Sequence, residues 1–115
     1  MEIAPGSIVK RPLKGILGLF YWHMGIYVGN DQVIHFDGEK KKNLKAVLRH
    51  DRLKDFAAGH AVEVHAVPDD EDHGAAICRE ARRLWQNRGN GFDGNYNFAF
   101  NNCEDFCVMC FEVCY

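Results

Sequence analysis

The sequence lacks the long apolar run of a membrane-spanning helix and the opening segment of a secreted protein. Its longest apolar stretch, residues 16–22, has seven residues, whereas a transmembrane helix needs about 20. A signal peptide has a positively charged start, then an apolar region and a small-residue cleavage site. The N-terminal sequence, which opens Met1-Glu2-Ile3-Ala4-Pro5-Gly6, does not follow this pattern, so we expect no signal peptide. These absences predict a cytoplasmic protein, in solution or at most peripheral on a membrane.

The chain also lacks internal repeats, low-complexity tracts and any linker that could divide it. Its 115 residues are 47% hydrophobic and 26% charged, which is close to the average of globular domains. This length is too short for a TIM barrel, and a chain of this size needs no disulfide or metal to fold. We therefore predict a single domain over residues 1–115.

The cysteines do not form the paired pattern of a secreted disulfide scaffold. There are five of them, an odd number, and four lie in the last 13 residues. This distribution favours a reducing compartment and free thiols.

No strong excess of positive charge points to nucleic acid. The net charge is −2, although residues 1–54 carry ten basic and five acidic side chains and residues 55–115 carry four and eleven. We interpret the two halves as solvated faces of one fold. The alternative is that cations of the first half hold an anionic lipid surface or a phosphate group, and the candidate side chains are Lys10, Arg11, Lys14 and Lys40–Lys42.

The order of elements predicts strands first and helices last, which is an α+β fold. Strands are expected over residues 6–9, 22–28, 33–36, 45–49 and 61–67, with a short helix over residues 51–58. The acidic run at residues 69–72 predicts the start of a long helix with an apolar stripe, for which we expect a packing role. Asn102 is expected to cap a last helix that begins at Cys103 and runs to about Val113.

Two histidines, His23 and His35, lie on the two strands of a predicted hairpin. If residues 29–31 form a three-residue turn, Gly25 lies opposite His35, and both imidazoles project from one face. A two-residue turn at 30–31 is expected to place them on opposite faces, so the register decides the geometry. No role is assigned to the other histidines, which are expected in loops or at exposed strand positions: His50, His60, His65 and His73.

Cys103 is the candidate nucleophile. At the first position of a helix, the unpaired N–H groups and the helix dipole stabilise a thiolate. An imidazole beside it supplies the general base that activates a thiol, and a second polar group can orient that imidazole. The alternative is that Cys103 is a small buried apolar residue, like Cys107 and Cys110.

Three separated motifs resemble those of a known family. Tyr21–Gly29, Val33–Phe36 and Asn101–Phe106 resemble the H-box and the NC-box of LRAT-domain proteins, the lecithin retinol acyltransferase-like branch of the NlpC/P60 superfamily of thiol hydrolases. The resemblance extends over about residues 5–113. Two positions depart from the pattern, because Asp105 stands where the NC-box usually has histidine and Met24 where the H-box often has tryptophan.

The resemblance implies an antiparallel sheet with packed helices in a circularly permuted papain-like fold. It also implies that Cys103 attacks an acyl ester and forms an acyl-thioester, which passes to water, an amine or an alcohol. In this scheme His23 is the general base and acid, His35 orients it, Tyr21 lies near the oxyanion site, and Asn102 shapes the turn before the cysteine. The expected activity is that of a thiol-dependent acyltransferase or phospholipase A-like hydrolase. No cofactor is implied, and the expected partner is an acyl-ester lipid or another small acyl donor.

Four alternatives compete with this interpretation. One is an NlpC/P60-type cysteine amidase or peptidase, which the missing signal peptide and the histidine-before-cysteine order disfavour. Another is a non-catalytic binding module that keeps the same geometry. Zinc binding by His23, His35 and Cys103 is chemically feasible. The spacing of Cys103, Cys107 and Cys110 also matches an iron–sulfur motif, but a helical stripe of this kind indicates core packing.

Overall fold

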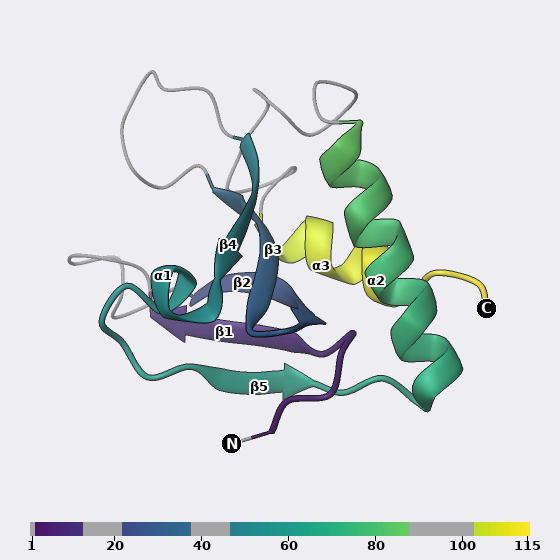
Figure 1. Cartoon of the computed structure of the whole chain (residues 1–115), viewed down its shortest axis with the longest axis horizontal. Helices are drawn as coiled ribbons and strands as arrows, with labels where there is room; N and C mark the ends of the chain where they lie inside the picture. Colours follow the sequence, from purple (N-terminus) through teal and green to yellow (C-terminus); the bar gives the residue numbers. More distant parts are fainter. Residues whose placement is uncertain (1, 13–21, 38–46, 88–102) are drawn as a thin grey trace.

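The sheet consists of five antiparallel strands in the order β4-β3-β2-β1-β5. A computed structural model describes residues 2–12, 22–37, 47–87 and 103–115. The elements, drawn in Figure 1, are β1 (Ile8–Pro12), β2 (Trp22–Gly29), β3 (Gln32–Asp37), β4 (Val47–Arg52), α1 (Leu53–Ala57), β5 (Glu63–Ala66), α2 (Glu71–Gln86) and α3 (Cys103–Phe111). The predicted α+β fold is confirmed.

The side chains of β2 alternate between two apolar clusters, one on each face of the sheet. Met24, Ile26 and Val28 belong to the main core, which α2 and α3 complete. Tyr27 packs instead against a smaller cluster that contains Phe56 of α1. Figure 1 shows α2 and α3 side by side and α1 apart from both. The strand period of two therefore sends His23 and Gly25 to the α1 face and their neighbours to the main core.

Helix α2 matches the prediction from the acidic run and the apolar stripe. The Asp70 side chain caps it by accepting the backbone N–H of His73 at 2.8 Å. The stripe residues Ile77, Ala81 and Leu84 are buried. None of the helices in the described ranges is long and apolar enough to cross a membrane.

Several predicted boundaries were wrong, since β1 spans Ile8–Pro12 and not residues 6–9, and β4 runs to Arg52 and not to residue 49. Asp51 and Arg52 belong to β4, because they pair with β3, and α1 begins only at Leu53. Helix α3 ends at Phe111, short of Val113, so Cys114 lies beyond the helical stripe and is exposed. The expected Asn102 cap lies outside the described residues.

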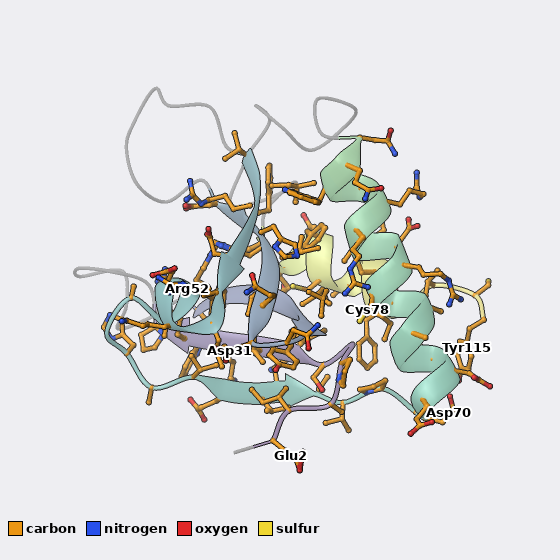
Figure 2. All side chains as sticks on the ribbon, viewed as in Figure 1. Glu2, Asp31, Arg52, Asp70, Cys78 and Tyr115 are labelled. Atoms are coloured by element: carbon orange, nitrogen blue, oxygen red, sulfur yellow. The ribbon has the colours of Figure 1, made fainter. Side chains whose placement is uncertain are left out.

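His73 contradicts the expectation that it is exposed. It is buried in α2, where its Nδ1 accepts the Asp69 backbone N–H at 2.9 Å and its Nε2 donates to the Phe111 carbonyl at 2.8 Å. Its ring stacks on Tyr115, with centroids 4.4 Å apart. Figure 2 shows Tyr115 near Asp70, at the start of α2. His73 therefore ties the end of the chain to α2.

We expect His73→Phe to lower the free energy of unfolding by about 2 kcal/mol, because a phenyl ring keeps the ring contacts but leaves the Asp69 N–H and the Phe111 carbonyl unsatisfied. Urea unfolding followed by circular dichroism measures the change. Tyr115→Phe is the matched control, since it removes only an exposed hydroxyl that donates to Asp69 at 2.7 Å. Equal effects of the two substitutions would contradict the structural role given to His73.

Candidate functional site

A β-bulge places the two site histidines on one face of the sheet. Asn30 and Asp31 both have positive φ and form a two-residue turn, the arrangement expected to separate the histidines. The register nevertheless shifts between Tyr27 and Gly29, so that Gly25 lies opposite His35. Val28 is the extra residue of this bulge, and it moves the ladder by one position. The predicted pairing is therefore confirmed, although the turn that produces it is shorter than expected.

The imidazoles of His23 and His35 are in direct contact. His23 Nε2 lies 2.8 Å from His35 Nδ1, and the two rings are nearly perpendicular, at 83°. Both side chains are buried. The Phe56 ring covers the pair, stacked on His23 at 5.3 Å and edge-on to His35 at 5.1 Å. The two imidazoles are therefore packed against an apolar ring on the α1 face.

Asp51 is a member of the site that the sequence reasoning missed. His35 Nε2 lies 2.9 Å from its Oδ2, which also accepts from Arg49 Nε at 2.9 Å. Arg49 is directly opposite His35 in the ladder between β3 and β4, and Asp51 is diagonal to it, a spacing that long side chains can bridge. The hydrogen bond from His35, assisted by Arg49 and opposed by burial, holds the pKa of Asp51 well below its usual range.

Cys103 is the first residue of α3, as predicted. It is also buried in the main core, as the alternative of a packing role expects. Its Sγ lies 3.8 Å from the carbonyl oxygen of Trp22, which belongs to the peptide unit that leads into His23. Within the described residues, Trp22 and His23 of β2 pair only with β1, because the pairing of β2 with β3 begins at Gly25. The thiol therefore lies against the backbone that leads into His23, at the end of β2 from which that imidazole projects, while its own packing is with the main core.

The other cysteines of α3 serve packing. Cys107 and Cys110 lie in the main core, and burial raises the pKa of both thiols. Burial also raises the pKa of Cys78 in α2. Among the described residues, no three metal-ligating side chains come together as a metal site. His23 and His35 instead contact each other, and the structure gives no support to the zinc alternative.

A polar pocket of about 280 Å³ lies on the α1 face beside His35 and Asp51. Arg11 also lines it, but this residue is not the surface cation that the charge distribution suggested. Its side chain is buried and donates to the carbonyl oxygens of Phe56, at 3.0 Å, and Pro12, at 2.9 Å. Lys14, Lys40–Lys42 and the predicted site residues Tyr21 and Asn102 lie outside the described residues.

Comparison with known proteins agrees with the motifs. The family model for LRAT, lecithin retinol acyltransferase, matches residues 2–112 of the 115. No curated protein matches the chain.

Proposed function

From the premise that this chain belongs to the lecithin retinol acyltransferase family, we propose that it is a thiol-dependent acyltransferase or acyl hydrolase. Cys103 is the nucleophile, His23 the general base and acid, and His35 the residue that orients His23. The observation that carries the proposal is the buried contact of 2.8 Å between the two imidazoles, at the end of β2 where the Cys103 thiol lies.

The chemistry requires the thiol to lose a proton before it attacks and to regain one when the thioester is cleaved. His23 takes the proton from Cys103 Sγ, and the thiolate attacks the carbonyl carbon of an acyl ester. A carbon–sulfur bond forms, the carbon–oxygen ester bond breaks, and the leaving alcohol takes the proton from His23. Water, an amine or an alcohol then gives a proton to His23 and attacks the carbonyl carbon of the thioester. The carbon–sulfur bond breaks, and the proton on His23 returns to the Cys103 sulfur. The position at the N-terminus of α3 favours the negative charges that develop on sulfur and oxygen.

The surface next to the thiol suits an acyl-ester lipid. Trp22, whose carbonyl contacts Cys103, is 39% exposed. The ammonium group of Lys10 lies 4.4 Å from the centroid of its ring. An apolar ring beside a cation offers contacts to an acyl chain and to a phosphate group, which supports a phospholipid as donor and peripheral contact with a membrane surface.

Intact-mass spectrometry after incubation with short-chain phosphatidylcholine tests the proposal. We expect a mass increase of one acyl group on the wild type, together with released fatty acid, and neither with Cys103→Ala or His23→Ala. Cys114→Ser serves as background throughout, because Cys114 is the exposed thiol. The buried thiols of Cys78, Cys107 and Cys110 have raised pKa values and are internal controls that stay unmodified near neutral pH.

The outcomes separate the competing interpretations. Absence of both adduct and fatty acid, with Cys103 still selectively alkylated by iodoacetamide near pH 7, would reject the lipid donor and keep the nucleophile. Cleavage of a peptide amide by that thiol would favour the amidase. A folded protein whose Cys103 is no more reactive than a free cysteine would favour a binding module.

A further inference from the structure

We propose that Asp51 is a positioning residue that fixes the tautomers of His35 and His23, so that the basic lone pair of His23 lies on Nδ1. Asp51 acts through His35 and does not touch the thiol. Its importance for activating Cys103 rests on the function proposed above, whereas the tautomers themselves follow from the hydrogen bonds of the described residues.

The hydrogen bond between Asp51 and His35 fixes the tautomer of His35. An ionised carboxylate can only accept hydrogen bonds, and the two donors around Asp51 keep its pKa low. Asp51 Oδ2, at 2.9 Å from His35 Nε2, therefore requires a hydrogen on that nitrogen. In the neutral imidazole, the other nitrogen of His35, Nδ1, must then be an acceptor.

The hydrogen bond between the two imidazoles fixes the tautomer of His23 in the same way. His35 Nδ1 lies 2.8 Å from His23 Nε2, and since Nδ1 accepts, His23 Nε2 must donate. A neutral His23 with its hydrogen on Nε2 has its lone pair on Nδ1. One carboxylate on β4 therefore determines, through two rings, which nitrogen of His23 can take a proton.

Arg49 and the pocket show why Asp51 remains a carboxylate. Arg49 donates to Oδ2 at 2.9 Å, so this oxygen accepts from two donors at once. The carboxylate forms part of the wall of the polar pocket and is 21% exposed, so water can solvate its charge while the imidazoles stay buried. The site thus combines a partly exposed carboxylate with two buried imidazoles.

Long-range ¹H–¹⁵N spectra of the histidine side chains in the full chain test the tautomers directly. At a pH where the histidines are neutral, we expect wild-type His23 to carry its hydrogen on Nε2, with Nδ1 unprotonated. The resonances of the two rings are assigned by their loss in His23→Phe and His35→Phe. A wild-type His23 with its hydrogen on Nδ1 would overturn the proposal without any variant of Asp51.

The matched variants are Asp51→Asn and Asp55→Asn. Both aspartates line the pocket, but Asp55 bonds to the exposed Arg52 at 3.1 Å and not to a histidine. An amide no longer requires a hydrogen on His35 Nε2, so we expect Asp51→Asn to change the ¹⁵N chemical shifts of both histidine rings. We also expect it to slow the alkylation of Cys103 by about 10²-fold, which is less than the roughly 10⁴-fold loss known for the wrong tautomer in a serine protease. Asp55→Asn is expected to change neither, and Asp51→Glu to restore part of the rate.

The two readouts keep the proposals separable. If the ¹⁵N chemical shifts of the two rings are unchanged in a folded Asp51→Asn protein, the positioning role is overturned, whatever the activity of that variant. Changed ¹⁵N chemical shifts together with slower alkylation of Cys103 support the positioning role, even if the wild type forms no acyl adduct. In that case only the proposed function fails.

Discussion

His23→Ala is expected to reduce acyl turnover by about 10³-fold or more, because a positioned general base contributes 10²- to 10⁴-fold to such a reaction. Alkylation of Cys103 near pH 7 is expected to slow as well, since the thiol then has no imidazole to take its proton. The rate of iodoacetamide modification, followed by mass spectrometry in the Cys114→Ser background, measures the second effect without any substrate.

The substitution needs controls because His23 is completely buried and stacked on Phe56. His23→Phe keeps the stacked ring and removes both nitrogens, so it separates the loss of the base from the loss of packing. His50→Ala removes another imidazole, which packs against Trp85 of α2 at 4.9 Å and lies on the opposite face of the sheet. Wild-type alkylation in a folded His23→Phe protein would show that the helix N-terminus alone activates the thiol.

Local sequence signals predicted most of the elements that carry the site. The alternating pattern of residues 22–28 gave the two faces of β2, and the acidic run with its stripe gave α2. Cys103 is the first residue of α3, as expected. These features depend on neighbours along the chain, which a sequence displays directly.

The features that depend on pairing between distant strands were harder to predict. The residues Gly29, Asn30 and Asp31 suit either a two-residue or a three-residue turn. The bulge at Val28 depends on the register of the whole pairing between β2 and β3. The short helix predicted over residues 51–58 included Asp51, which the structure places in β4. Its role became visible only from its diagonal position to His35 across β3 and β4.

Gly25→Ala is expected to disrupt the histidine pair and to destabilise the fold. A Cβ atom built on Gly25 would lie 2.6 Å from Val33 Cγ1, 3.0 Å from His35 Cβ and 3.1 Å from a ring carbon of Phe56. Overpacking of this kind costs about 1–3 kcal/mol. The crowding falls on His35 close to its backbone, so the imidazole must move, and a displacement of about 1 Å in a catalytic group can cost 10²-fold in rate. Cys103 alkylation and urea unfolding measure the two effects.

Gly29→Ala is the matched control for this prediction. Gly29 lies in the same strand and has a φ of +93°, so a side chain there strains the backbone by about 1–2 kcal/mol. The nearest atom to its added Cβ is in the Pro5 ring, at 3.6 Å, on neither histidine. Both substitutions should therefore lower stability, but only Gly25→Ala should slow alkylation and turnover by about 10²-fold. Equal losses of rate in the two variants would mean that stability, and not the space above Gly25, limits the reaction. A larger loss in Gly25→Ala would show that the absence of a side chain at Gly25 keeps the two imidazoles in contact.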